Sequence, residues 1–200
     1  MKIRSELTFL TVLLIAIVGM IGCVRTRPVT YYTLSPQPAG QLSPAGKDFT
    51  GIRIGIGPVR FSKLIDRPQI VSRTTPNKVA LAEFHRWGGD LSEDFLLVMT
   101  NNIRQLCGSG LFLRHPWPQE FAPRYRVEFD VHQFDGALGG TVALNVTWMV
   151  RTSGSDDLVV NSSVIEEKTS GDDYQSLVEA ENRALEKLSR LVVEALPSGR

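Results

Sequence analysis

The chain has 200 residues, of which 42% are hydrophobic and 22% are charged, and its formal net charge at pH 7 is +1. This length fits one ordinary domain with a short extension, and this composition is sufficient for a packed core. A nearly neutral chain lacks the electrostatic signature of a nucleic-acid-binding protein. Two cysteines are too few for a disulfide framework or a four-cysteine zinc site. The numbers therefore indicate a modest folded domain.

Residues 1–22 have the pattern of a secretory signal peptide. Lys2 and Arg4 supply a short basic start, and the sixteen residues 7–22 carry no charge. A bilayer-spanning helix needs ~20 apolar residues, so this run better suits the apolar region of a signal. It ends in Met20-Ile21-Gly22-Cys23, which resembles a bacterial lipobox, where cleavage precedes a cysteine that is then acylated. The alternatives are an uncleaved anchor or an ordinary signal peptide.

The lipobox resemblance implies a lipid anchor at Cys23. Several acyl chains on one cysteine exceed the two hydrophobic signals that stable membrane anchoring needs. Val24 stands where an aspartate would be the inner-membrane retention signal of such lipoproteins, so the resemblance implies the periplasmic face of the outer membrane. Acylation of Cys23 leaves Cys107 without an intramolecular disulfide partner, and we expect Cys107 to be a small buried hydrophobic residue.

Residues 23–50 are predicted to be the lipidated cysteine and a Pro-rich tether. Four prolines and two glycines interrupt residues 24–49. Within this segment Tyr31-Tyr32-Thr33-Leu34 is rich in strand-forming residues and is predicted to dock as a first edge strand. Even fully extended, residues 24–49 would reach only about 90 Å. We therefore expect the domain to work close to its membrane.

Residues 51–197 are predicted to form one folded domain that contains several β-strands. Alternating hydrophobic residues or short apolar runs predict strands at 52–59, 69–73, 78–84, 111–113, 124–134, 142–150 and 158–166. The last three strands follow one another through turns that contain glycine or aspartate. This succession favours an antiparallel meander.

Two long amphipathic helices are expected in the same domain. The first covers 90–107, where Asp90 and Glu93 have the spacing of a capping box and Gly108 is suited to end the helix. The second starts near Asp172 and ends before Pro197, with a hydrophobic stripe that only Glu181 interrupts. The sequence predicts a single α/β domain of six to eight strands, in which both helices pack on a mixed sheet with a C-terminal antiparallel meander.

The sequence motifs of catalysis and metal binding are not found. His85, His115 and His132 are scattered without a metal-ligand spacing, so we expect solvated or hydrogen-bonded histidines. Gly108-Ser109-Gly110 does not belong to a G-x-S-x-G motif and predicts a helix end followed by a turn. We assign no catalytic residue, cofactor or metal ligand, and predict that the chain is not an enzyme.

Several short motifs occur in a characteristic order. Cys23 is followed by Tyr31-Tyr32-Thr33-Leu34 and then by Ile54-Gly55-Ile56-Gly57-Pro58-Val59. Leu64-Ile65-Asp66-Arg67-Pro68-Gln69-Ile70-Val71 is the most distinctive block, with Ile65 where leucine is common. Glu83, Arg86-Trp87 and Asn101-Asn102-Ile103 come next. Together these motifs resemble the PqiC-type family of ABC-type transport auxiliary lipoproteins, whose typical block is L-D-R-P-Q-I-V.

This resemblance implies that residues 51–197 are an auxiliary lipoprotein domain in a lipid transport system that supports envelope integrity. Relatives work beside MCE-family (PqiB-like) periplasmic tunnel proteins and their inner-membrane permease or ATPase, and can form homo-oligomeric rings. A short tether agrees with this arrangement, because the lipoprotein would dock at the outer membrane and the MCE partner would span the distance from the inner membrane. The alternative function is an independent periplasmic lipid-binding carrier or an envelope hydrolase.

The matching block also suggests residues that contact a partner. We expect Asp66, Arg67 and Pro68, together with Arg86 and Trp87, to bind a partner or another subunit, since tryptophan and arginine are frequent in binding hot spots. The alternative is that Asp66-Arg67-Pro68 only forms a turn between strands and that Trp87 fills the edge of the core. For Trp117, which lies between two prolines, the core-edge role is the favoured one.

Overall fold

The computed structural model describes residues 27–197. The predicted signal peptide and Cys23 lie outside the described residues. Within the described range the elements are β1 (Thr30–Tyr32), β2 (Arg53–Phe61), β3 (Gln69–Thr75), β4 (Lys78–Trp87), α2 (Leu91–Cys107), β5 (Leu111–Arg114), the 3₁₀ turn η1 (Gln119–Phe121), β6 (Tyr125–Gly136), β7 (Thr141–Thr152), β8 (Leu158–Lys168) and α3 (Tyr174–Ala195). Every strand and both helices predicted from the sequence are present, and the mixed α/β fold is confirmed.

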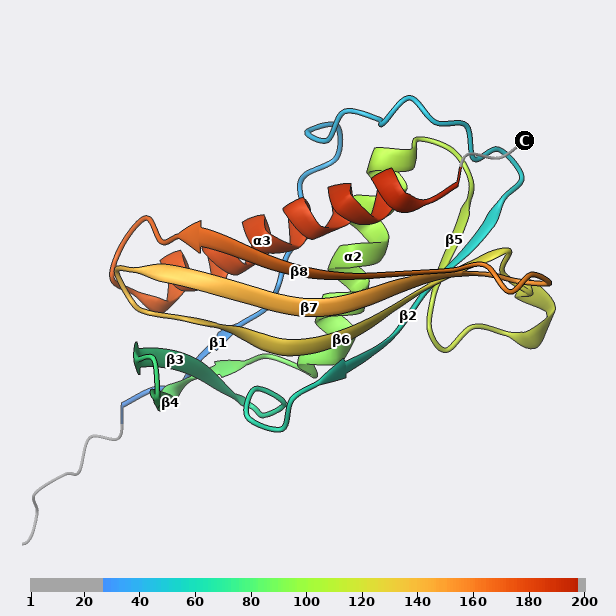
Figure 1. Cartoon of the computed structure of the whole chain (residues 1–200). Helices are drawn as coiled ribbons and strands as arrows, with labels where there is room; N and C mark the ends of the chain where they lie inside the picture. The colour runs from blue at the N-terminus through green and yellow to red at the C-terminus, as the bar shows by residue number, and fades with distance from the viewer. Residues whose placement is uncertain (1–26, 198–200) are drawn as a thin grey trace, which may run out of the picture.

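The strands join one mixed sheet built around β6 (Figure 1). On one side of β6, strands β7 and β8 follow in antiparallel order, which confirms the predicted meander. On its other side, β6 runs parallel to β2 and then meets β3 at one residue pair, Ser72 with Gly136. Strand β5 continues the sheet beyond β2, whereas β4 and β1 continue it beyond β3. The β1–β4–β3 branch is therefore joined to the rest of the sheet through very little backbone pairing.

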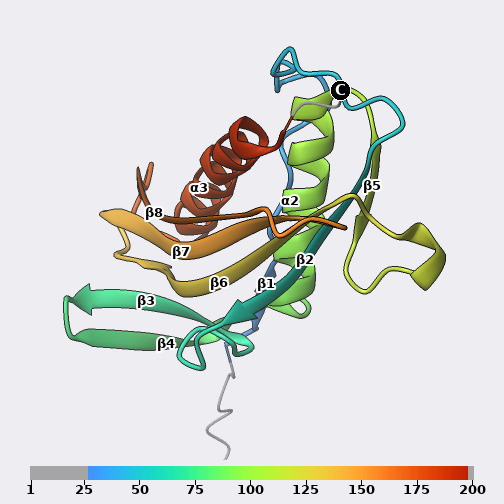
Figure 2. The ribbon, with the colours of Figure 1, turned by 45° about the vertical axis from the view of Figure 1, so that its right-hand side comes forward.

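Both helices cover the same face of the sheet and pack against each other, so the opposite face is open (Figure 2). Asp90 is the N-cap of α2 and accepts hydrogen bonds from the backbone N–H groups of Ser92 and Glu93 at 2.8 and 3.4 Å. Gly108 ends α2 in the left-handed region at φ 68°. The Glu93 carboxylate pairs with Arg114 at 3.3 Å instead of returning a capping-box bond.

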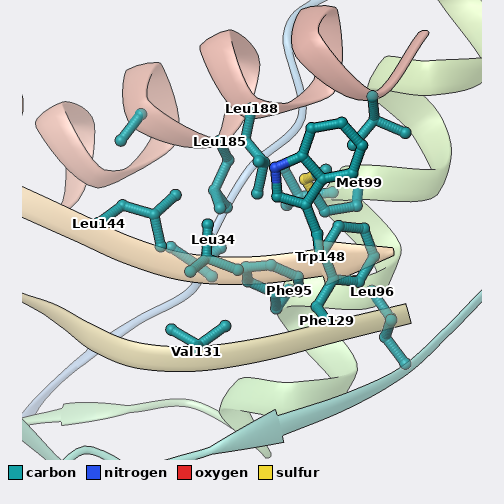
Figure 3. Packing of buried hydrophobic residues seen from close by; sticks show 14 of the residues in the cluster. Leu34, Phe95, Leu96, Met99, Phe129, Val131, Leu144, Trp148, Leu185 and Leu188 are labelled. Atoms are coloured by element: carbon teal, nitrogen blue, oxygen red, sulfur yellow. The ribbon is translucent and has the colours of Figure 1, made fainter. Parts of the chain in front are cut away.

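The hydrophobic core lies between this helix layer and the sheet (Figure 3). Phe95 and Met99 of α2 meet Leu185 and Leu188 of α3 above the inward row of β7, where Trp148 lies. All of these side chains are buried. The indole N–H of Trp148 donates to Ser163 Oγ at 3.0 Å, so this polar group is satisfied within the core. The hydrophobic stripes of the two helices and the alternating hydrophobic residues of the strands thus face each other and form one core.

Residues 33–50 differ from the sequence prediction, because they pack along α2 and α3 as an irregular strap. Leu34, Leu42 and Phe49 of the strap are buried in the core. Strand β1 pairs in parallel with His85–Trp87 of β4 at the edge of the sheet, as predicted for Tyr31 and Tyr32. The folded domain therefore begins at Thr30, about twenty residues before the predicted boundary at residue 51.

Side chains from both helices hold the backbone of the strap. The N–H of Ser35 donates to Asn182 Oδ1, and the N–H of Gln37 donates to Asn102 Oδ1, each at 3.0 Å. Prolines and glycines prevent regular secondary structure, but an irregular segment can still pack when side chains satisfy its backbone groups. Composition alone therefore could not distinguish this strap from a tether.

Candidate functional site

The Asp66-Arg67-Pro68 block lies at one corner of the molecule, between β2 and β3 and beside the start of α2. Asp66, Arg67, Pro68, Gly89, Asp90 and Leu91 line a small cavity of about 170 Å³ there. We call these six residues the corner. Asp66, Pro68, Gly89 and Asp90 are exposed. The structure thus brings the three predicted contact residues together with a second segment of chain.

The loop that carries Asp66 is fixed by its own backbone and by a buried side chain. The N–H groups of Ile65 and Asp66 both donate to the Ser62 carbonyl at 3.1 Å, and the N–H of Ser62 donates to Val131 on β6 at 3.0 Å. Ile65 is buried beneath the loop. Its hydrophobic side chain holds the following Asp66 at the surface.

Arg67 has a structural as well as a surface role. Its Nη2 donates to the Lys63 carbonyl at 3.1 Å, and its Nε is buried without a hydrogen-bond partner among the described residues. The Pro68 carbonyl accepts from the N–H of Trp87 at 2.8 Å, which ties the block to β4. The turn-forming interpretation of the block is therefore true of its backbone, while the Asp66 and Pro68 side chains stay accessible.

Arg86 and Trp87 lie next to the corner at the end of β4. Arg86 is in register with Gln69 on β3, is half-buried, and donates from Nε to the Glu83 carbonyl at 3.3 Å. Trp87 is only 5% exposed and belongs to the core cluster. Trp87 is therefore linked to the corner through its backbone N–H, and Arg86 is the member of this pair that reaches the surface.

The corner combines both signs of charge. Asp66 and Asp90 are acidic, and Arg67 and Arg86 are basic. Hydrogen bonding from Ser92, at its side chain and then its backbone N–H, together with the N–H of Glu93, outweighs burial and lowers the pKa of the Asp90 carboxyl. Asp90 is therefore held in its charged form as the N-cap of α2. Gly89, Asp90 and Leu91 were not predicted as site residues, although Asp90 was recognisable in the sequence as the cap of a helix.

Several other sequence predictions concern chemistry away from the corner. Tyr32 Oη and His85 Nδ1 are hydrogen-bonded at 2.9 Å, and His132 Nε2 bonds Thr147 Oγ1 at 3.0 Å. Cys107 is buried, and desolvation raises the pKa of its thiol to about 12. Across residues 27–197, no three His, Cys, Asp or Glu side chains cluster in a way that could hold a metal ion. Neither helix of that range has the length and apolarity required to cross a bilayer.

Residues 32–193 match the family model of the ABC-type transport auxiliary lipoprotein component. A crystal structure of an uncharacterized protein is similar with a TM-score of 0.70 and 15% identity, covering 84% of this chain and 98% of that one. A crystal structure of a protein from Xanthomonas campestris has a TM-score of 0.67 and 15% identity, covering 82% and 93% of the two chains. No curated protein matches.

At 15% identity these two structures establish the shared fold alone. The family model covers most of the chain, starts within β1, includes the strap and the corner, and ends within the last turn of α3. The chain therefore belongs to the family of ABC-type transport auxiliary lipoprotein components.

Proposed function

We propose that this protein is a non-enzymatic docking subunit of an MCE-type lipid transport system, anchored through acylated Cys23 to the periplasmic face of the outer membrane. The corner is the observation that carries this proposal. In a chain of the auxiliary lipoprotein family, the most distinctive sequence block forms an exposed surface of mixed charge on a fixed loop. Fixed polar and charged groups of this kind suit recognition of a protein partner.

The anchor restricts where the corner can work. Only six residues separate Cys23 from Thr30, where the folded domain begins. Fully extended, the chain from Cys23 to Thr30 reaches about 25 Å, far less than the predicted tether. The domain then stays beside the outer membrane, and a partner from the inner membrane has to span the distance. Asp66, Arg67, Pro68 and Arg86 provide the proposed contact, and the buried Trp87 is bonded to Pro68 through its backbone N–H.

The docking proposal is tested by reversing one charge at the corner. Asp66→Lys changes an exposed side chain that has no ion pair among the described residues, so the fold should be retained. Affinity purification from membranes should then recover at least about tenfold less of the MCE-type protein than with the unaltered chain, because like charges at a contact are repulsive. Asp156→Lys, at the exposed turn between β7 and β8, is the matched control and should recover the normal amount. Equal recovery with both variants would count against docking at the corner.

The anchor is tested separately. Mass spectrometry of the mature protein should find an acylated N-terminal cysteine derived from Cys23, and Cys23→Ser should release a folded domain from membranes. Because folded residues begin at Thr30, circular dichroism of the released protein should be unchanged. A Cys23→Ser protein that still fractionates with the outer membrane would show that attachment does not depend on the acyl chains.

A further inference from the structure

The open face of the sheet carries a second cavity, far along the sheet from the corner. Gly55 of β2 presents no side chain on this face, and Trp117, from the loop after β5, lies over it. The ring of Trp117 lies so close that a Cβ on Gly55 would be 2.7 Å from its Cη2 atom. His115 meets this ring edge-on with centroids 5.4 Å apart. Trp117 therefore packs on bare backbone rather than filling the edge of the core.

This arrangement leaves a cavity of about 260 Å³ beside the tryptophan. Its lining residues are Gly57, Pro58, His115, Pro116, Trp117, Arg126 and Glu128. One wall is thus aromatic and proline-rich, and the other carries two charged side chains of β6. The volume suits a small polar group and is below the usual range for drug-sized ligands.

Arg126 has an unusual neighbour on this face. Arg151 of β7 is directly opposite Arg126 in the antiparallel register, so both side chains project from the same face of the sheet. Like charges directly opposite each other destabilise a sheet. Among the described residues neither arginine has a carboxylate within ion-pair distance, whereas Arg60 and Arg73 of the same sheet pair with Asp130 and Asp135 at 3.4 and 2.7 Å.

We propose that Arg126 and Arg151, with His115, form a binding site for a phosphate group. Guanidinium groups bind phosphate oxygens in bidentate geometry, and the anion would remove the repulsion between the two arginines. Glu128 and the Trp117 ring on the rim favour a ligand that also carries an ammonium group, because a carboxylate and an aromatic face both attract a cation. The phosphate can come from an ethanolamine phospholipid head group or from free phosphate. The site does not depend on docking at the corner.

The test is isothermal titration of the purified full-length protein in non-ionic detergent with two probes, inorganic phosphate and glycerophosphoethanolamine. Saturable binding is expected, and it should weaken at least about tenfold in a variant that carries both Arg126→Gln and Arg151→Gln. Lys168→Gln, which removes one exposed positive charge at the far end of β8, is the control and should bind as the unaltered chain does. Absence of saturable binding with both probes, or unchanged affinity in the double variant, would overturn the proposal.

The two sources of phosphate give different results. A head-group site binds glycerophosphoethanolamine more tightly than phosphate, and Glu128→Gln reduces that preference. Equal affinity for both probes identifies a free-phosphate site. Thermal unfolding provides a second measurement, because phosphate should raise the Tm of the unaltered protein and not that of the double variant. A Cys23→Ser protein should bind equally well, so failure of the anchor and failure of this site are distinguishable.

Discussion

Arg73 on β3 donates hydrogen bonds to both carboxylate oxygens of Asp135 on β6, from Nε to Oδ1 at 2.9 Å and from Nη2 to Oδ2 at 2.7 Å. The Asp135 side chain is 1% exposed and that of Arg73 is 26% exposed. Hydrogen bonding to Asp135 raises the pKa of the Arg73 guanidinium. This ion pair stands beside the single backbone pair that joins the β1–β4–β3 branch to the rest of the sheet. It is therefore the main polar connection between the branch near the corner and the meander.

Replacing Arg73 should loosen this connection. Arg73→Ala leaves the Asp135 carboxylate buried with Gln133 as its remaining hydrogen-bond donor. We expect the free energy of unfolding in urea to fall by about 2–4 kcal/mol, since solvent screens part of the effect at the arginine. Arg60→Ala breaks an exposed pair and should lower it by less than about 1 kcal/mol. Equal losses in the two variants would show that the Arg73 pair has no special role.

Glu181 of α3 should make stability depend on pH. Its side chain is buried, its Oε2 has no hydrogen-bond partner among the described residues, and desolvation followed by repulsion from Asp135 raises its pKa well above the ordinary value. The folded state therefore favours the protonated form. The stability that protonated Glu181 contributes to the free energy of unfolding is fully present below the unfolded-state pKa of about 4.3. It is lost as the pH rises from there towards the folded-state pKa.

Glu181→Gln keeps the shape and removes the titrating group. At pH 7 the variant should be more stable than the unaltered protein by about 1–3 kcal/mol, and this difference should shrink as the pH approaches 4. Urea unfolding at pH 4, 5, 6 and 7 measures it. A difference that is constant with pH, or that grows towards pH 4, would contradict the buried-acid explanation.

Lys47 should fasten the strap to the end of α3. Its Nζ donates to the carbonyls of Val193, Glu194 and Leu196 at 3.2, 2.6 and 2.8 Å. These are terminal helix carbonyls that a cation satisfies and that the helix dipole makes negative. Lys47→Met should cost about 1–2 kcal/mol and accelerate amide hydrogen exchange in the last turn of α3 and in the strap. Lys63→Met, at an exposed loop position, should change neither quantity.

Gly55 should not tolerate even one methyl group. Gly55→Ala places a Cβ 2.7 Å from the Trp117 ring, so the ring has to move off the sheet. We expect a loss of about 1–2 kcal/mol and a red shift of tryptophan fluorescence, as the half-buried ring becomes wetter. Gly89→Ala, where a Cβ meets nothing within 4 Å, is the matched control. Trp117→Ala in the same chain should abolish the cost of Gly55→Ala, and persistence of that cost would exclude the ring as its cause.

Local patterns were sufficient for much of the fold. The stripe from Leu91 to Leu106 and the strict alternation from Tyr125 to Val131 predicted α2 and β6 within a few residues. The strap escaped prediction, because Pro36, Gly40 and Pro44 indicate only an absence of regular structure. Whether such a segment packs depends on acceptors such as Asn102 and Asn182, which are far away in sequence.

For the candidate site as well, the local sequence predicted some features and not others. The block around Asp66 was recognisable as a motif, and its turn character followed from proline and aspartate. That Gly89 and Asp90 share its cavity, and that the Trp87 N–H bonds the Pro68 carbonyl, follows from the pairing of β3 with β4 and from the position of α2. The predicted role of Trp117 at the core edge was wrong, because its ring packs against the backbone of Gly55, which has no side chain.

By itself, the sequence determined the order of the elements, their inward faces, the ends of α2 and the lipoprotein family. Each of these depends on the pattern of residues that are close together in the chain. Tertiary structure alone decided that Arg73 meets Asp135, that Glu181 is buried near that carboxylate, and that Arg126 stands opposite Arg151. These relationships depend on strand register and on the contact between helix and sheet. They arise when the whole core packs, and no local pattern specifies them.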